Sequence, residues 1–393
     1  MAKYNFDEPT DRKGTHALKT DALEERYGYA DLIPMWVADM DFKSPPAIKD
    51  AIIKRAEHGI FGYTCASDEY YNAIINWVDR RHDWKIKKEW ISYIPGIVKG
   101  IAFVIDCFTD SNDGVIIQPP VYHPFRIIPT LHNRKVINNN LRLEAGQYKM
   151  DMEDLKKQIQ NSSSNLLILC NPHNPGGRVW TRQELIDIAE ICYDNNILVI
   201  SDEIHSDLAF NEHKHIPFAS VSEKAEQNSI TFMAPSKTFN IAGIVSAYSI
   251  VPNDKLREKF YKFLESSELN DGTIFAYLAA QAAYNQSEDW LEEVKSYLWD
   301  NIQFVDKYLK ENIPQIEAII PQASFLIWLD CRKLNLSQPQ LESLFVNEAK
   351  LALNSGTMFG KDGLGFMRLN IGTQRSVIKK SLDNLKGAID RNK

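Results

Sequence analysis

The sequence has no long apolar run and no excess of positive charge. Its 393 residues include 45 Lys and Arg against 52 Asp and Glu, which gives a formal net charge of −7. An acidic chain is not attracted to nucleic-acid phosphates or to an anionic membrane surface. The longest apolar run near the middle of the chain, residues 101–108, contains Asp106 and is far shorter than the roughly 20 residues that cross a bilayer. We therefore expect neither a nucleic acid nor a membrane as a partner.

Cysteine patterns that would indicate disulfides or metal binding are also missing. The five cysteines form no CxxC pair, and three of them, Cys107, Cys170 and Cys192, lie in apolar periodic segments. His213 and His215 have no third ligand in view, so we expect no metal site. The first nine residues contain no apolar stretch typical of a signal peptide. These features predict a cytoplasmic protein with reduced core thiols.

Two nucleotide-binding motifs are absent as well. No GxGxxG segment follows an expected strand, there is no Walker A motif, and the glycines of 360–365 have neither the required order nor the context. These absences argue against a nicotinamide or nucleotide site.

What the sequence does contain is an alternation of helix and strand from residue 45 to about residue 284. Apolar runs of strand length at 166–170 and 197–201 flank a helix that begins with a capping box at Thr181. Continuous apolar strands between helices indicate parallel strands covered on both faces. The predicted fold is α/β, a three-layer sandwich with a mostly parallel central sheet.

The pattern changes towards the C-terminus and predicts a smaller α+β unit there. A long helix over 290–312 precedes expected strands at 316–320, 325–330 and 365–371, a helix near 338–348 and a final helix from Arg375. The first 45 residues lack strong periodicity, and we expect them to pack against this unit. The predicted division is an N-terminal segment, a large cofactor-binding domain and a small domain, over residues 1–45, 46–285 and 286–393.

Three polar residues follow the ends of three expected strands in the large unit. Asn174 lies four residues after Cys170, Asp202 directly follows Ser201, and Lys237 follows a strand over 230–234. In open α/β sheets, ligands bind beyond the carboxyl ends of the strands. Taken singly, each residue has an ordinary explanation as a turn residue, a helix cap or an exposed lysine.

Taken together, the three side chains match the needs of pyridoxal phosphate. The amine of Lys237 can condense with the aldehyde, and the carboxylate of Asp202 can keep the pyridine nitrogen protonated. The amide of Asn174 can donate to the phenolic oxygen. The set therefore predicts a pyridoxal phosphate site.

A phosphate cradle is available where a glycine turn opens a helix, in the segment 93–100. Backbone N–H groups and the helix dipole suit an anion at this position. The expected donors are Gly96, Ile97 and Val98.

Two further residues suit an amino-acid substrate on this cofactor. Tyr122 follows an expected strand at 115–118 and can offer an aromatic face to the pyridine ring, although a core tyrosine is an equal alternative. Arg368 lies in a strand of alternating apolar residues, where a guanidinium needs an anionic partner. That partner is either the α-carboxylate of a substrate or the carboxylate of a structural salt bridge.

At these motifs the chain resembles, over nearly its whole length, the fold-type I pyridoxal phosphate enzymes of the aspartate aminotransferase superfamily. Within that superfamily it is most similar to the MalY/PatB branch of cystathionine β-lyases. The segments that carry this resemblance are Met35–Phe42, Phe61–Thr64, Ser201–His205 and Ser236–Asn240.

The resemblance implies roles for the residues around the cofactor. Lys237 would be the covalent attachment site and the catalytic base, Asp202 would pair with the pyridine nitrogen, and Tyr122 would stack on the ring. His205 stands where aminotransferases usually carry a tyrosine near the phenolic oxygen.

The resemblance also implies substrate contacts and a dimer. Arg368 and Trp36 would bind the substrate. Tyr63 would reach the phosphate of the neighbouring subunit, which implies a homodimer with shared active sites.

Two positions depart from the aminotransferase pattern at the phosphate. Val245 stands where an arginine is usual, and Ala234 stands where a serine is frequent. Phosphate binding would then depend on backbone amides, Ser236 and Tyr63. A milder departure is the Asn-Pro-Gly-Gly sequence of 174–177.

The resemblance implies α,β-elimination, which converts cystathionine or a related cysteine thioether to pyruvate, ammonia and a thiol. Amino transfer stays open, since both reactions begin with loss of the Cα proton. A third alternative is a regulatory role in which the same fold binds another protein.

Overall fold

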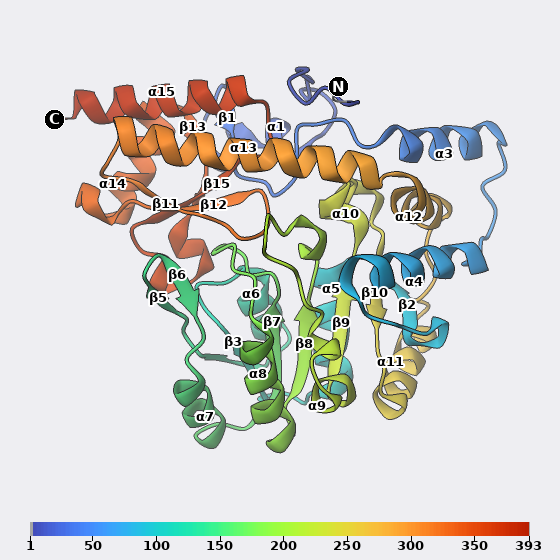
Figure 1. Ribbon diagram of the computed structural model, residues 1–393. Coiled ribbons are helices and arrows are strands. Elements are labelled where there is room, and N and C mark those ends of the chain that lie inside the picture. Colours follow the sequence, from blue (N-terminus) through green and yellow to red (C-terminus); the bar gives the residue numbers. More distant parts are fainter. Residues whose placement is uncertain (1–2, 393) are drawn as a thin grey trace.

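The computed structural model describes residues 3–392 and has an α/β architecture built around a seven-stranded sheet (Figure 1). The strand order is β2–β10–β9–β8–β7–β3–β4. All strands run in one direction except β10, which is antiparallel to both of its neighbours. The strands are β2 (Ile91–Ile94), β3 (Gly114–Ile117), β4 (Lys135–Asn138), β7 (Ser164–Cys170), β8 (Leu198–Asp202), β9 (Ser229–Met233) and β10 (Ala247–Ile250).

Helices cover both faces of this sheet because its strands are apolar on both sides. Along β7, Leu166 and Ile168 belong to one core and Leu167 and Leu169 to another, as expected when successive side chains point to opposite faces. In Figure 1, α7 and α8 lie in front of the sheet and α5 behind it. The first core contains α5 (Ile97–Phe108), α6 (Pro124–Leu131) and α11 (Asp254–Ser266); the second contains α7 (Met152–Gln160), α8 (Arg182–Asp194) and α9 (Glu223–Gln227). The predicted three-layer sandwich is confirmed.

A group of helices packed around α12 lies beside the β2 edge of the sheet, at the right of Figure 1. Here α12 contacts both α3 and α4. The helices are α3 (Pro46–Glu57), α4 (Asp68–His82) and α12 (Ile274–Gln286).

The C-terminal part forms a second, antiparallel sheet in the order β11–β12–β15–β14. Above it α13 and α15 pack side by side (Figure 1). The expected single helix near 338–348 is instead α14 followed by a π-helical turn over Leu344–Glu348. The elements are α13 (Glu288–Asn312), β11 (Glu317–Ile319), β12 (Leu326–Asp330), α14 (Gln338–Ser343), β14 (Asn354–Ser355), β15 (Phe366–Asn370) and α15 (Arg375–Arg391).

The N-terminal segment is joined to this C-terminal sheet region by backbone and side-chain contacts. Strand β1 (Ile33–Pro34) pairs in parallel with β13 (Leu351–Ala352). The amide of Asn370 donates to the carbonyl oxygens of Val37 and Asp39. Two short helices, α1 (Leu18–Asp21) and α2 (Leu23–Tyr27), precede β1. Separately, β5 (Arg142–Glu144) and β6 (Gln147–Lys149) form an antiparallel hairpin between β4 and α7.

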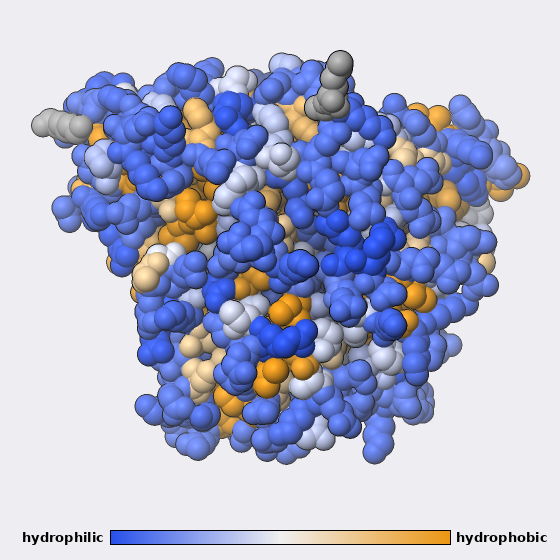
Figure 2. Space-filling model, in the orientation of Figure 1, coloured by the Kyte–Doolittle hydropathy of each residue, from blue (hydrophilic) through white to orange (hydrophobic). Residues whose placement is uncertain are grey.

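The surface carries only scattered apolar groups on the face seen in Figure 2, which is largely hydrophilic. Over residues 3–392, no helix is both long enough and apolar enough to span a bilayer. All five cysteines are unpaired.

Candidate active site

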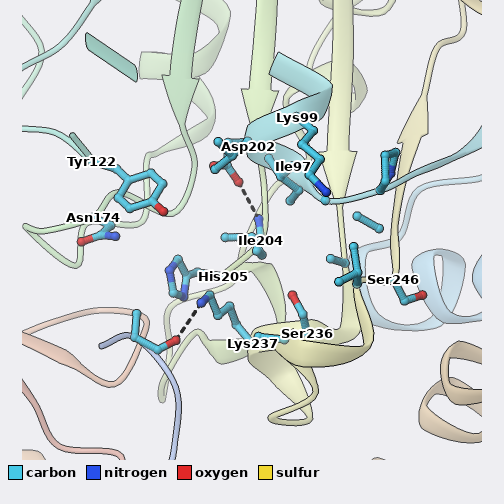
Figure 3. A pocket seen from close by; sticks show the side chains of 18 of the residues that line it. Ile97, Lys99, Tyr122, Asn174, Asp202, Ile204, His205, Ser236, Lys237 and Ser246 are labelled. Atoms are coloured by element: carbon cyan, nitrogen blue, oxygen red, sulfur yellow. Dashed lines mark hydrogen bonds between the residues drawn. The ribbon is translucent and has the colours of Figure 1, made fainter. Parts of the chain in front are cut away.

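A pocket of about 360 Å³ lies beyond the carboxyl ends of β7, β8 and β9 (Figure 3). It is the place where the ends of parallel strands bring distant segments together. The sequence-predicted residues that line it are Gly96, Ile97, Val98, Tyr122, Asn174, Asp202, His205, Ser236 and Lys237.

Lys237 projects into this pocket from α10 (Pro235–Thr238), the short helix that follows β9. Its Nζ donates a hydrogen bond to the carbonyl oxygen of Ala38 at 2.7 Å. Burial lowers the pKa of Lys237 to about 8, because an ammonium loses hydration there. The amine is therefore much closer to its neutral, nucleophilic form at neutral pH than an ordinary lysine.

Asp202 is the last residue of β8 and faces the same space (Figure 3). One carboxylate oxygen accepts a hydrogen bond from the backbone N–H of Ile204 at 3.1 Å. The side chain is buried, and burial raises its pKa to about 7. A cationic group beside it, such as a protonated pyridine nitrogen, would stabilise its ionised form.

Asn174 is oriented by Arg368. Its Oδ1 accepts from Nη1 of Arg368 at 3.1 Å, which leaves the amide NH2 to face the pocket (Figure 3). The amide thus presents two N–H donors to the pocket. The loop is tied to the neighbouring aromatic residue, because the backbone N–H of Tyr122 donates to the carbonyl oxygen of Asn174 at 3.0 Å.

Arg368 is a buried cation without a carboxylate partner. Its side chain is bonded to neutral oxygens only, the carbonyl of Trp36 at 2.9 Å and Oδ1 of Asn354 at 2.7 Å, besides Asn174. No ion pair joins it to any residue of 3–392, and its Nε has no hydrogen-bond partner there. Burial lowers its pKa to about 10, so it stays charged at neutral pH. The sequence left a structural salt bridge open for Arg368; within the described chain that alternative is wrong, and a buried guanidinium of this kind calls for an anionic ligand.

His205 and Tyr122 form further walls of the pocket (Figure 3). Burial, reinforced by Lys237 and Arg368, lowers the pKa of His205 to about 3, so its imidazole is neutral. Its Nδ1 is buried without a partner among the described residues. Burial also raises the pKa of the Tyr122 phenol, which keeps that ring uncharged.

One end of the pocket, where the phosphate of a cofactor could bind, is formed by the first turn of α5. Gly96 is the N-cap with φ of 106°, a conformation that favours glycine, and it has no side chain to cap the helix. The backbone N–H groups of residues 97–99 make no hydrogen bond within residues 3–392. Free N–H groups at a helix N-terminus suit an anion. The hydroxyl of Ser236 also lies at this end.

These features fit pyridoxal phosphate on chemistry. The pocket offers an amine of lowered pKa, a buried carboxylate, an oriented amide, an aromatic wall and unpaired backbone donors. Two nitrogens at this site are buried without partners among the described residues. Nε of Arg368 is a donor that calls for an acceptor, and Nδ1 of His205 donates or accepts according to its tautomer.

Three sequence-predicted residues are not part of the pocket wall: Arg368, which reaches it only through Asn174, and Trp36 and Tyr63. The indole of Trp36 is buried against Tyr27 and donates from Nε1 to the carbonyl oxygen of Lys19 at 3.0 Å. Only its backbone carbonyl reaches Arg368, so a direct side-chain contact with substrate is not supported. Tyr63 is fully exposed and is not part of the pocket of its own chain.

Several lining residues were not anticipated from the sequence. Ala38 accepts from Lys237 although 199 residues separate them, and no local pattern signals such a contact. Cys170 lines the pocket and its sulfur accepts from the backbone N–H of Asn174 at 3.4 Å. Lys99 also lines it; its place three residues after Gly96, in the first turn of the helix, is the signal that could have pointed to it.

Comparison with known proteins decides the family. The model of the aminotransferase class I and II family matches residues 30–385. The chain belongs to this family.

Among curated members of the aminotransferase class I and II family, the chain is similar to cystathionine β-lyase PatB of Bacillus subtilis (strain 168). The two are 40% identical over 385 residues, which cover 98% of this chain and 100% of PatB.

Two solved structures are similar over almost the whole chain. One is a provisionally named aminotransferase from Clostridium difficile 630 with bound pyridoxal phosphate, at a TM-score of 0.96 and 44% identity, covering 98% of this chain and 100% of the other. The second is a pyridoxal-phosphate-bound C–S lyase from Staphylococcus hominis, at a TM-score of 0.90 and 33% identity, covering 98% of each chain.

Proposed function

We propose that the protein is a pyridoxal-phosphate-dependent carbon–sulfur β-lyase that cleaves cystathionine or a related cysteine thioether. The convergence of Lys237, Asp202 and Asn174 in one pocket supports the cofactor. The full-length similarity to a cystathionine β-lyase supports the reaction. The overall reaction takes a thioether and water to pyruvate, ammonia and a thiol.

The cofactor, when bound, supplies an electron sink that makes the Cα–H of an amino acid acidic. Lys237 is the base that takes this proton at its Nζ, since its lowered pKa leaves the amine available near neutrality. The carbonyl of Ala38, 2.7 Å from Nζ, holds the amine in place. The electron pair left at Cα then forms a bond to Cβ as the Cβ–S bond breaks and the thiolate departs.

The surrounding residues orient the reactants and tune their charge. With the cofactor bound, Asp202 would stabilise a proton on the pyridine nitrogen, and the amide of Asn174 would donate to the phenolic oxygen. Arg368 binds the α-carboxylate through its unpaired Nε, while its contacts with Asn174 and Asn354 hold the guanidinium still. His205, neutral and next to Lys237, can donate a hydrogen bond without adding charge.

The test is a product assay on cystathionine. Purified protein should release pyruvate and homocysteine in equal amounts with no added keto acid. The Lys237→Ala variant, reconstituted with the cofactor, should release neither. Absence of pyruvate from the wild-type protein would refute the lyase proposal.

Amino transfer is the second candidate, because the Clostridium difficile structure of 44% identity carries an aminotransferase name. The same assay separates the two. An aminotransferase would consume the amino acid only in proportion to an added keto acid and would form no thiol.

We further propose a cytoplasmic homodimer that shares its active sites. The segment 59–66 of each chain exposes Ile60, Phe61 and Tyr63 at 66%, 59% and 112%, and three neighbouring apolar side chains of such exposure suit an interface. Tyr63 of one subunit would reach the phosphate of the other. Light scattering gives the mass, and mixed dimers of Tyr63→Ala and Lys237→Ala subunits should recover one functional site in every heterodimer.

The division into residues 1–45, 46–285 and 286–393 is also a proposal. It is supported by the separate seven- and four-stranded sheets, whose strands fall within 91–250 and 317–370, and by the pairing of β1 with β13. Limited proteolysis with mass spectrometry of the fragments tests the boundaries.

A further inference from the structure

Lys99 is an unpaired cation at the mouth of the pocket. It stands in the first turn of α5 and lines the pocket (Figure 3). Its side chain is exposed and forms no hydrogen bond or ion pair with any residue of the described range 3–392. Its ammonium is therefore free to meet a ligand.

The roles assigned so far to the charged residues of the pocket leave the cofactor phosphate without a countercharge. Of the lining side chains, only Lys99, Asp202 and Lys237 carry formal charge, since His205 is neutral. In the proposed function Lys237 is the base and Asp202 serves the pyridine nitrogen. A phosphate dianion would then face the first turn of α5, where the helix dipole supplies only about half a positive charge.

The opposite wall of this phosphate end is apolar. Val245 lies against the glycine turn, with its Cγ1 4.0 Å from the position that a Cβ would take on Gly96. Val245 ends a tight turn, and its φ of 58° places its backbone in the left-handed region. Ser246 lines the same wall, but its hydroxyl donates to the carbonyl oxygen of Ala276 at 3.1 Å. No second cation is supplied from that side.

We propose that Lys99 is the countercharge of the cofactor phosphate, with its ammonium pairing a phosphate oxygen while the backbone N–H groups of residues 97–99 bind the others. This inference rests on the proposed function, because it assumes the phosphorylated cofactor. It assigns to α5 both the dipole and the formal charge that hold the anion.

The test compares two forms of the cofactor that differ only in the phosphate. Apoprotein is titrated with pyridoxal phosphate and with pyridoxal, and each dissociation constant is read from the quenching of tryptophan fluorescence. Lys99→Gln should weaken pyridoxal phosphate about tenfold, the scale of one charge-assisted contact in a partly exposed site. Its affinity for pyridoxal should not change. Lys99→Arg keeps the charge and should bind both forms as the wild-type protein does.

Lys262→Gln is the matched control, an exposed lysine on α11 outside the pocket with no ion pair among the described residues. It should leave both constants unchanged. The loss in Lys99→Gln should shrink in high salt, because salt screens an exposed pair.

Two results would overturn the inference. The first is an unchanged affinity of Lys99→Gln for pyridoxal phosphate, and the second is equal weakening of both forms. If the first result came with a raised KM for cystathionine, Lys99 would instead lie at the distal carboxylate of the substrate. Failure of the proposed function looks different, since wild-type protein would then bind the cofactor and yet release no pyruvate.

Discussion

The Nζ of Lys237 lies 2.7 Å from the carbonyl oxygen of Ala38, a residue 199 positions earlier in the chain. This hydrogen bond places part of the N-terminal segment in direct contact with the reactive amine. It also explains why Ala38 belongs to the pocket wall although it carries no chemistry of its own.

The lowered pKa of Lys237 predicts how the apoprotein captures its cofactor. Only the neutral amine attacks an aldehyde, so the rate of cofactor capture should rise with pH and level off above about pH 8. With a lysine of ordinary pKa, the rate would level off only above about pH 10.4. Stopped-flow absorbance after mixing with pyridoxal phosphate measures the profile, with Lys237→Ala as the blank. A plateau delayed to the ordinary range would show that burial does not tune this amine.

Replacing Asp202 by Asn should remove the charge that keeps the pyridine nitrogen protonated. We expect a fall in kcat of about 10²–10³-fold, the usual scale for losing one buried electrostatic partner of the transition state. Exchange of the Cα proton with deuterium should slow in parallel, which NMR of the substrate records. Asp202→Glu keeps the charge and should lose less. Equal activity of Asp202→Asn and wild type would contradict the assigned role.

Arg368→Lys should raise KM for cystathionine about tenfold to a hundredfold with a smaller change in kcat. A lysine keeps the charge but cannot hold Asn174, Asn354 and a carboxylate at once, because it lacks the planar guanidinium fork. Steady-state kinetics with pyruvate detection separates the two constants. Binding of an amine without a carboxylate should be nearly unaffected. A similar loss for that amine would mean that Arg368 acts only through Asn174.

Gly177→Ala should lower the free energy of unfolding by more than the usual cost of placing a non-glycine residue at a positive φ angle. Gly177 has φ of 64°, and an added Cβ would lie 2.4 Å from Cβ of Pro321. We expect a loss of about 2–4 kcal/mol in the free energy of unfolding.

The matched control for this prediction is Gly146→Ala. Gly146 has φ of 77° but nothing within 4 Å of its added Cβ, so only the conformational cost of about 1 kcal/mol remains. Denaturant unfolding of both variants gives the difference. Equal losses would show that the contact with Pro321 relaxes freely.

Local sequence patterns predicted the sandwich and most of the pocket for a physical reason. Side chains that follow consecutive parallel strands must meet at one edge, so Asn174, Asp202 and Lys237 could be placed together from strand ends alone. The apolar runs of β7 and β8 marked strands buried on both faces, and the structure confirms this.

Contacts between distant segments could not be predicted in this way. The antiparallel pairing of β10 with β2, the pairing of β1 with β13 and the hydrogen bond from Lys237 to Ala38 join residues far apart in sequence. Their sequences carry no matching signal, because strand direction and loop packing are decided by the rest of the fold. Arg368 was recognised as needing an anion, but the absence of a protein partner was visible only in three dimensions.

The contact between Ala38 and Lys237 also sets an order of events during synthesis. Residues 36–39 are held in place by Arg368 and Asn370, which lie between 331 and 333 residues later in the sequence. During synthesis Ala38 and Lys237 both emerge before Arg368 and Asn370, so the contacts that hold residues 36–39 form only after residue 370 has been made. We therefore expect secure capture of the cofactor only after residues 368–370 have joined the fold.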